Sequence, residues 1–309
     1  MIIHKGYEAL DLKNPVVTLG IFDGVHRGHQ ALLKKLISMA RDVRGESVVM
    51  TFDPHPRQVL EKGTGKMSFL SSMDEKTALL DKAGADHLII IRFTVSFSKM
   101  DACDFIEKVL VGKVGTRHLI VGHDHRFGYH GNGNYDTVEE CARLMGFRVE
   151  QVQGLKTAGG AISSSIIREA LLSGNLDDAN KWLGYCYSLK GSVIEGRKIG
   201  RKIGFPTANL KPSCKFKLIP GDGVYAVEVQ IDDKKLPGML SIGRNPTVNK
   251  SPDKRSVEVH IFNFEKEIYG REIGIVFRHR LRDEIKFNNT DELARQMEQD
   301  KVNAMRLLK

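Results

Sequence analysis

The sequence predicts an α/β protein in which a doubly wound parallel sheet is followed by a small antiparallel β-barrel domain with a C-terminal helix. Two observations support this prediction. Up to about residue 180, short apolar runs rich in β-forming residues alternate with helical patterns, which is typical of a parallel sheet. After Tyr187, strand-like alternation and frequent glycines replace that rhythm and favour a small closed barrel. A chain of 309 residues is expected to form two domains, which we place at residues 1–183 and 184–309.

The expected sheet of the first domain is built from apolar runs, and helical patterns connect them. The predicted strands are residues 16–22, 47–52, 87–93, 118–121 and 147–152, and the predicted helices lie near residues 30–43, 74–83, 100–111 and 135–145. Ligands of such sheets bind at the carboxyl ends of the strands. The loops at residues 20–29, 53–56 and 122–128 follow three of these strands, so we expect them to meet at one rim of the sheet.

The turn after the first strand combines several features of a nucleotide site. Gly24 and Gly28 allow the backbone to approach a phosphate closely. The free N–H groups and the positive dipole end of the following helix attract anions. His26 and His29 are three residues apart and can both direct donors at an oxyanion. The turn therefore predicts a site for a nucleoside triphosphate.

Composition and charge exclude several classes of protein. Charged residues make up 28% and hydrophobic residues 41% of the chain, as in ordinary globular proteins. No apolar run approaches the roughly 20 residues that span a bilayer, and the N-terminus does not resemble a signal peptide, so we expect a cytoplasmic protein without a membrane segment. The four cysteines are far apart in the sequence, which favours free thiols over a disulfide framework or a zinc site. A loose group of four histidines, at residues 118, 123, 125 and 130, lacks metal-ligand spacing.

The net charge of +9 is concentrated rather than spread. Residues 190–219 contain eight Lys or Arg and one acidic residue, Glu195, among several glycines. A local concentration of this kind fits a polyphosphate site at least as well as a groove for nucleic acid.

Two further segments point to phosphate and metal chemistry. Ser163, Ser164 and Ser165 open a helix that also carries Arg168; one serine would suffice for a helix cap, so we favour a loop that closes on triphosphate oxygens. Residues 191–210 approach the pattern of a P-loop, but Arg197 stands where that loop needs lysine, which excludes it. Thr207 and Asn209 offer oxygen ligands for Mg²⁺, the alternative being a basic, solvated hairpin.

The remaining pattern fits the barrel. Strand-like runs lie at residues 223–229, 238–242, 257–264 and 273–277. On the third of these, Glu258, His260 and Phe262 share one face, and the first two are either a surface pair or part of a site. Thr290 is expected to cap a terminal helix whose apolar stripe serves packing rather than function. The members of that stripe are Leu293, Met297, Ala304 and Leu308.

These motifs, in this order, resemble the bacterial bifunctional riboflavin kinase/FAD synthetases over almost the whole chain. The segments that carry the resemblance are residues 20–29 (Gly-x-Phe-Asp-Gly-x-His-x-Gly-His), 51–56 (Thr-Phe-Asp-Pro-His-Pro), 122–128, 163–168, 191–209 with its Gly-Phe-Pro-Thr-Ala-Asn ending, 241–248 and 281–287. The sequence departs from the family at His125, Ser165 and Val248, where the family more often has Phe, Thr and an aromatic residue.

The resemblance implies a function for each domain. The first would be a Rossmann-like nucleotidyltransferase that joins AMP from ATP to FMN, giving FAD and pyrophosphate, and the second a kinase that phosphorylates riboflavin to FMN. The implied catalytic residues are His26, His29, Arg168 and Glu258, the last as general base, and the implied Mg²⁺ ligands are Thr207 and Asn209. The implied nucleotide-binding residues are Gly20, Phe22, Asp23, Gly24, Gly28, Ser163, Ser164, Ser165, Gly196, Arg197, Gly200, Gly204, Pro206 and Asn245. The implied flavin-binding residues are Phe52, His55, Pro56, Asp124, Phe127, Arg282, Glu284 and Phe287.

Two other interpretations remain open at this point. An adenylyltransferase with one activity would explain the first domain but not the Pro-Thr-Ala-Asn segment or Glu258. A nucleic-acid-binding protein would show affinity that falls steeply with salt. We expect ATP, riboflavin and FMN as partners and no nucleic acid, and the sequence leaves the oligomeric state open.

Overall fold

The computed structural model describes residues 1–61, 67–123, 126–157, 160–196, 200, 204–244 and 255–309. The chain forms two compact units, Met1–Ser164 and Ser165–Lys309. The predicted boundary between residues 183 and 184 falls at the end of helix α7 (Leu176–Leu183), and it stays a prediction. Among the described residues, no helix combines the length and the apolar character that crossing a membrane requires.

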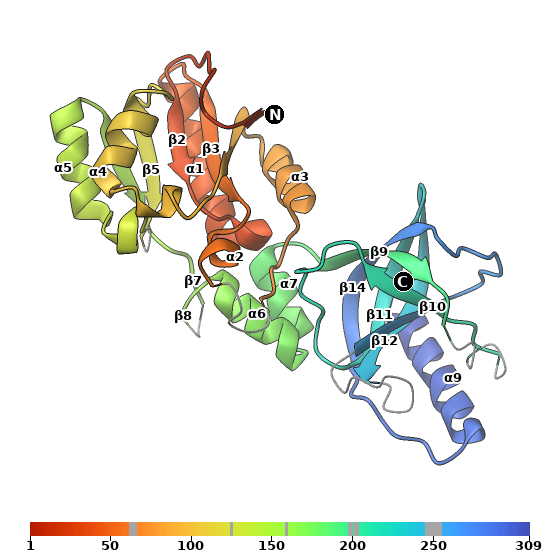
Figure 1. The fold of residues 1–309 in the computed structure, drawn as a ribbon. Coiled ribbons are helices and arrows are strands. Elements are labelled where there is room, and N and C mark those ends of the chain that lie inside the picture. The colour runs from red at the N-terminus through yellow and green to blue at the C-terminus, as the bar shows by residue number, and fades with distance from the viewer. Residues whose placement is uncertain (62–66, 124–125, 158–159, 197–199, 201–203, 245–254) are drawn as a thin grey trace. The chain divides into compact units, whose positions relative to one another are not determined.

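The first unit is a parallel sheet in the strand order β1-β4-β3-β2-β5-β6 among the described residues (Figure 1). Its strands are β1 (Ile2–Lys5), β2 (Val16–Leu19), β3 (Ser47–Asp53), β4 (His87–Arg92), β5 (His118–Gly122) and β6 (Arg148–Val152). The predicted parallel sheet is confirmed. The edge strand β1 was missed, because a run of four residues with Ile2 and Ile3 largely exposed carries little periodic signal.

Helices cover both faces of this sheet. They are α1 (Arg27–Asp42), the short α2 (Pro56–Leu60), α3 (Met73–Ala83), α4 (Ala102–Phe105), which continues as a π-helix over Ile106–Val111, and α5 (Tyr135–Met145). Successive strand residues enter opposite cores: Val16 and Val49 pack with α1, whereas Val17 and Val48 pack with α4 and α5. Each fully buried Val or Leu contributes about 1.5–3 kcal/mol to folding, which explains why strands buried on both faces read as continuous apolar runs.

The structure corrects two boundaries near the first turn. The first strand ends at Leu19 rather than at residue 22, because Phe22 takes the left-handed φ of 50° and a short 3₁₀ turn follows at Asp23–Val25. The first helix begins at Arg27 instead of near residue 30, because His26 caps it. Both corrections place the two histidines at the N-terminus of α1.

The second unit begins with α6 (Ser164–Ser173) and α7, followed by a closed antiparallel barrel. Its described strands, in the order β10-β13-β12-β11-β14-β9, confirm the predicted barrel (Figure 1). They are β9 (Ser188–Ile194), β10 (Ala208–Pro212), β11 (Gly223–Ile231), β12 (Lys234–Arg244), β13 (Arg255–Ile261) and β14 (Glu272–Arg282). The basic segment, considered as a solvated hairpin, contributes the antiparallel pair β9 and β10 to the barrel wall.

The terminal helix α9 (Thr290–Leu307) packs on the outside of the barrel. Ala304 is fully buried in a cluster with Phe205 and Phe262, and Met297 and Leu308 pack against the same cluster, as the predicted stripe requires. The predicted cap is wrong: Asn289 caps the helix by accepting from the Glu292 N–H, and Thr290 is the first helical residue.

Candidate active sites

The turn after β2 is held by a buried carboxylate. Asp23 is 4% exposed, and its side chain accepts hydrogen bonds from the backbone N–H groups of Leu70 (2.9 Å) and Ser71 (3.1 Å). The Gly24 N–H donates to the Ser71 hydroxyl at 2.9 Å, and Gly24 has a φ of +76°, which favours glycine. The described contacts of Asp23 thus fix the shape of the turn, and its predicted contact with the nucleotide stays a prediction.

The two histidines of the turn lie against each other. Their rings stack with centroids 3.7 Å apart. The backbone N–H of His29 donates to the ring Nδ1 of the buried His26 at 3.4 Å. Nδ1 of His29 is buried and has no hydrogen-bond partner among the described residues. Burial, with smaller contributions from His26 and Lys76, holds the pKa of His29 well below 6.5. His29 is therefore neutral near pH 7 and can act as a hydrogen-bonding group rather than as a cation.

The serine segment meets this turn. The Ser164 hydroxyl donates to the Asp23 carbonyl at 2.9 Å, and a side chain at Gly28 would contact the Ile162 carbonyl. Two of the segments that the sequence assigned to the triphosphate are thus adjacent. Arg168 belongs to α6 in the second unit, where its Nη2 donates to the Ser165 hydroxyl at 3.3 Å.

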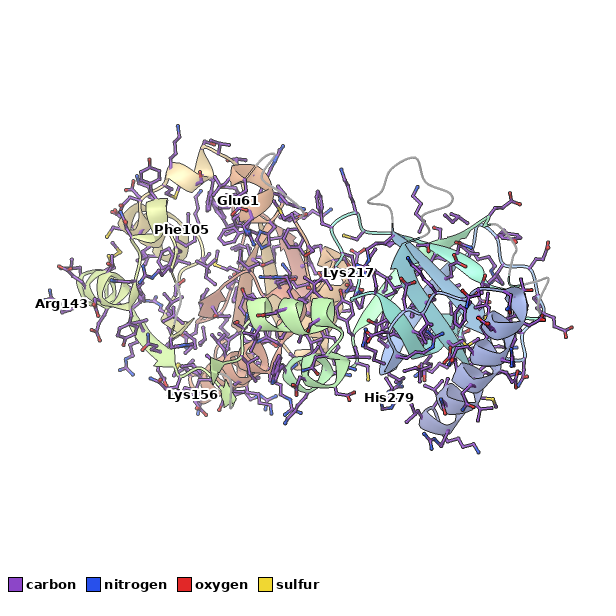
Figure 2. All side chains as sticks on the ribbon, turned by 90° about the horizontal axis from the view of Figure 1, so that it is seen from below. Glu61, Phe105, Arg143, Lys156, Lys217 and His279 are labelled. Atoms are coloured by element: carbon purple, nitrogen blue, oxygen red, sulfur yellow. The ribbon has the colours of Figure 1, made fainter. Side chains whose placement is uncertain are left out.

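A chain of aromatic ring contacts connects two of the predicted flavin-binding residues. Phe52, at the end of β3, contacts Phe97 (centroids 5.8 Å apart), Phe97 contacts Phe105 (5.9 Å), and Phe105 contacts Phe127 (5.6 Å); Figure 2 labels Phe105. Phe52 and Phe127 are both half-buried, so each end of this row is accessible to a planar ligand.

Three predicted flavin-binding residues of the first unit remain. Two of them form the start of helix α2, and the third lies outside the residues that the structure describes. His55 caps α2, accepts from the Arg57 N–H at 3.1 Å and stacks on Phe69 with centroids 4.4 Å apart. Pro56 is the first residue of that helix. Asp124 and its neighbour His125 lie outside the described residues, and so do Arg197, Asn245 and Val248 of the second unit.

Lys76 is a site residue that the sequence analysis missed. It lies on α3, is 5% exposed, and places Nζ 3.5 Å from the Thr51 hydroxyl, which lies 3.3 Å from the Ile21 carbonyl of the turn. Burial lowers the pKa of Lys76 to about 8, against the raising effect of Asp23 and Asp53. Lysine is seldom buried without a role, and the sequence signal was its position four residues before the buried Leu80.

In the barrel, the structure brings together the predicted base and the predicted metal ligands. Glu258 on β13 is the cross-strand partner of Asn209 on β10, and its Oε2 lies 3.4 Å from the Thr207 hydroxyl. Gly196 lies so close to Asn209 that any side chain there would overlap the Asn209 amide. A hydroxyl, an amide and a carboxylate form an oxygen donor set that suits Mg²⁺. The described part of the chain contains no group of three or more His, Cys, Asp or Glu that could hold a metal ion, and the assignment of Mg²⁺ to Thr207 and Asn209 stays a prediction.

His260 supports this segment rather than pairing with Glu258 on the surface. It is 8% exposed, its ring packs against Phe205 and Phe262, and its Nδ1 lies 2.7 Å from the Pro206 carbonyl. Burial lowers the pKa of His260, so it is neutral near pH 7 and donates Nδ1–H to that carbonyl. The interpretation of Glu258 and His260 as an exposed pair is therefore wrong, because His260 is buried against Phe205 and Phe262.

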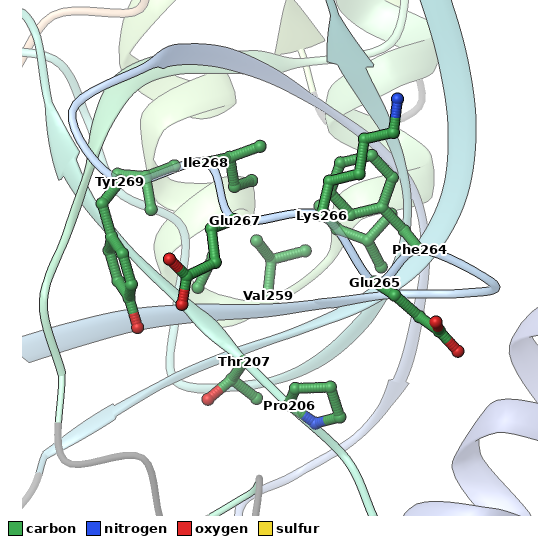
Figure 3. A pocket seen from close by; sticks show the side chains of 12 residues that line it. Pro206, Thr207, Val259, Phe264, Glu265, Lys266, Glu267, Ile268 and Tyr269 are labelled. Carbon is green, nitrogen blue, oxygen red and sulfur yellow. The ribbon is translucent and has the colours of Figure 1, made fainter.

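A cavity of about 270 Å³ opens beside Thr207. Its apolar lining includes Val193, Ala208, Val259 and Ile268, and the sequence analysis did not identify it (Figure 3). The segment 264–269 forms one wall and Pro206 and Thr207 lie at another, as Figure 3 shows. Its volume is below the roughly 300–1,000 Å³ of whole-ligand pockets, so it fits one ring system.

The three predicted flavin residues near the end of β14 have different environments. Arg282 is the last residue of β14, and its Nε and Nη2 bind the buried Asp300 at 3.0 and 2.7 Å. Removing one partner of such a pair costs about 3–5 kcal/mol, so Arg282 fastens α9 to the barrel. The Arg282 guanidinium also lies 5.9 Å from the centroid of the Phe287 ring. The Glu284 carboxylate lies so close to Gly243 that a side chain at position 243 would overlap it.

Comparisons with known proteins identify both units. A family model described as FAD synthetase matches residues 9–166, and one described as riboflavin kinase matches residues 183–308. The bifunctional riboflavin kinase/FMN adenylyltransferase of Listeria monocytogenes is 39% identical over 93% of this chain and 90% of its own length. The protein of the same description from Escherichia coli K12 is 36% identical over 94% of this chain and 91% of its own. A crystal structure described as a macrolide-efflux protein from Streptococcus pneumoniae covers 99% of both chains with a TM-score of 0.89 and 31% identity, and shares this fold.

Proposed function

The chain belongs to the family of bifunctional riboflavin kinase/FMN adenylyltransferases, and on that basis we propose which of its residues perform each reaction. The enzyme phosphorylates riboflavin with ATP to give FMN, and then transfers AMP from a second ATP to FMN, giving FAD and pyrophosphate. The observation that best supports our assignment is the contact of Glu258 with Thr207, beside Asn209. It brings the predicted general base next to the two predicted Mg²⁺ ligands.

For FAD formation, we assign the chemistry to the turn at the start of α1. A phosphate oxygen of FMN attacks the α-phosphorus of ATP, and the bond to the β-phosphate oxygen breaks as pyrophosphate leaves. The nucleophile is already an anion at neutral pH, so catalysis consists of positioning and charge stabilisation. The backbone N–H groups at the start of α1 and the neutral ring of His29 donate to phosphate oxygens, with Ser164 as a further donor. The role of Arg168 stays a prediction from the family resemblance.

The same unit would hold the flavin on its aromatic row. The isoalloxazine ring is planar and apolar over most of its area, and it gains from contact with aromatic faces. Phe52 and Phe127 lie at the two ends of the row; Phe52 is near the carboxyl end of β3, and Phe127 lies in the segment that follows β5. These positions support the assignment of both residues to FMN.

Lys76 adds a buried positive charge beneath the turn, and we predict that FAD formation depends on its protonation. The pKa of Lys76 is about 8, so its charge is present below that pH and is lost as the pH rises through 8. We therefore expect kcat/KM for ATP in FAD formation to fall above pH 8. In Lys76→Met, kcat/KM at pH 7 should be about tenfold to a hundredfold lower, and the decline above pH 8 should be absent.

The matched control for this prediction is Lys76→Arg, which keeps a charge that does not titrate in this range. It should retain more activity than Lys76→Met and move the alkaline decline to higher pH. Riboflavin phosphorylation by the same proteins shows whether the effect is confined to one reaction. A wild-type profile that stays flat to pH 10 for FAD formation would contradict the role of Lys76.

For FMN formation, we assign the chemistry to the barrel. Glu258 accepts the proton of the riboflavin 5′-hydroxyl as its oxygen attacks the γ-phosphorus of ATP, and ADP leaves. Thr207 and Asn209 would hold Mg²⁺ with ATP, and the ion would neutralise charge on the phosphates. Gly196 leaves room for the Asn209 amide, and His260 holds the strand through Pro206.

We propose that the cavity beside Thr207 receives the adenine ring of this ATP. The cavity adjoins the predicted phosphate ligands, whereas the predicted flavin residues Arg282, Glu284 and Phe287 are absent from its lining. Ala208→Phe fills the cavity, so the KM for ATP in riboflavin phosphorylation should rise about tenfold or more with little change in the KM for riboflavin. The KM for ATP in FAD formation serves as the control. Equal changes in the KM values of ATP and riboflavin would contradict this placement.

The general experiment is a chromatographic time course of riboflavin with the purified protein, ATP and Mg²⁺. FMN should appear first and FAD later. No conversion of riboflavin or of supplied FMN would contradict the proposed residue roles together with the function. We also propose that the protein acts in the cytoplasm and has no nucleic acid partner, since its positive charge is concentrated in one glycine-rich segment of the sequence, residues 190–219.

A further inference from the structure

Two of the cysteines are neighbours in space. Cys103 on α4 and Cys141 on α5 are 38 positions apart in the sequence, yet their sulfur atoms lie 2.9 Å from each other. Cys103 is exposed and Cys141 is buried. Both other cysteines, Cys186 and Cys214, belong to the second unit and are partly exposed. The four cysteines are free thiols, as predicted, but the sequence did not indicate that two of them form a close pair.

We propose that Cys103 and Cys141 form a reversible disulfide when the protein meets a hydroperoxide. The bond length of a disulfide is about 2.05 Å, so the sulfur atoms need to approach by less than about 1 Å. The two helices are already packed against each other, so the bond forms without a rearrangement of the fold. The exposed position of Cys103 gives the oxidant access, and the buried position of Cys141 keeps the second thiol next to it.

The chemistry proceeds in two balanced steps. The Cys103 sulfur attacks one oxygen of the hydroperoxide and the O–O bond breaks; Cys103 becomes a sulfenic acid, and the other oxygen takes up the thiol proton and leaves as water or an alcohol. The Cys141 sulfur then attacks the Cys103 sulfur, water leaves with the Cys141 proton, and the disulfide results. Burial and the adjacent Cys103 raise the pKa of Cys141 to about 12, so Cys141 stays protonated until this second step. Two thiols and one hydroperoxide thus give one disulfide and two small oxygen products.

The pair lies beneath the segment that carries Phe127. A side chain at Gly128 would come within 2.8 Å of Ala102, the Tyr129 N–H donates to the Met100 carbonyl at 3.0 Å, and Phe127 packs on Phe105. This segment leads directly into α5, which carries Cys141. A disulfide would therefore join the helix below the segment to the helix that follows it, and restrict its motion.

The consequence for catalysis rests on the proposed function, in which Phe127 contacts FMN. With the segment restricted, we expect the KM for FMN in FAD formation to rise several-fold in the oxidised protein. The KM for riboflavin in FMN formation should stay unchanged, and dithiothreitol should reverse the effect.

The test uses the full chain, treated with a small molar excess of hydrogen peroxide, alkylated and analysed by intact and peptide mass spectrometry. Two of the four thiols should become resistant to alkylation, with a peptide that links Cys103 to Cys141. Cys186→Ser and Cys214→Ser are the matched controls and should form the same link. Cys103→Ser replaces an exposed residue and should abolish the link. Cys141→Ala, the second variant, should abolish it as well.

Three results would overturn the inference: four thiols still open to alkylation, a link that involves Cys186, Cys214 or a second chain, or Cys103 oxidised to sulfinic acid without a link. A correct link that leaves the KM for FMN unchanged would overturn only the coupling to Phe127. Continued FAD formation by the reduced protein would leave the proposed function intact in every case.

Discussion

Replacing His29 with alanine is expected to abolish FAD formation while leaving FMN formation intact. The His29 ring stacks on His26 at the N-terminus of α1, and its buried Nδ1 has no protein partner among the described residues. A donor that meets charge only in the transition state is worth about 10²–10³ in rate, and this substitution also removes the packing that orients His26. We expect the rate of FMN adenylylation to fall at least a hundredfold.

Two controls make this result specific. Since His29 is partly buried, the thermal unfolding of His29→Ala has to be compared with that of the wild type, and His29→Asn offers a smaller change with a polar group retained. His279, on β14, is a partly exposed histidine far along the chain, and His279→Ala should keep both activities. Loss of both FMN and FAD formation in a folded His29→Ala would contradict separate sites.

Glu258→Gln is expected to lower the rate of riboflavin phosphorylation by about 10²–10⁴-fold, the usual contribution of a general base. Glutamine keeps the size of the side chain and its contact with Thr207 but cannot accept the proton of the riboflavin hydroxyl. FAD formation from supplied FMN should be unchanged. The measurement is the initial rate of FMN production at saturating ATP and riboflavin.

The matched control is Glu228→Gln, which changes a carboxylate on β11 of the same barrel. Glu228 pairs with Arg278 at 3.2 Å and Lys235 at 3.8 Å. The substitution should leave phosphorylation within a few-fold of the wild-type rate. Equal losses in the two variants would assign the effect of Glu258 to charge or stability rather than to proton transfer.

The parts of the fold that sequence predicted are those with long periodic signals. The strands buried on both faces, the amphipathic helix α5 and the apolar stripe of α9 each repeat one pattern over several residues, and packing then follows from geometry. The edge strand β1 and the π-helical continuation of α4 were not predicted. Exposure removes the pattern from β1, and an α- and a π-helix share too similar a periodicity to be separated.

The sites were predictable where chemistry lies within one segment, and not where it depends on distant partners. The turn at His26 and His29 and the segment with Thr207 are each contiguous, so their residue types alone predict phosphate and metal binding, and both stay predictions. Lys76 approaches the turn from another element, Arg282 is bound by Asp300 from α9, and Cys103 meets Cys141 across 38 positions. The pattern of a single sequence does not show which residues of two distant elements come into contact, so only the structure reveals these contacts.

The most direct test of the account is complementation between two inactive variants. Glu258→Gln alone should convert riboflavin very slowly, and His29→Ala alone should stop at FMN. When the two are mixed with riboflavin, ATP and Mg²⁺, FMN made by the intact barrel of one should be adenylylated by the intact first unit of the other. Chromatography should then show FAD at a rate close to that of the wild type at equal site concentration. A mixture that accumulates FMN without FAD, although both proteins are folded, would contradict the assignment of one reaction to each unit.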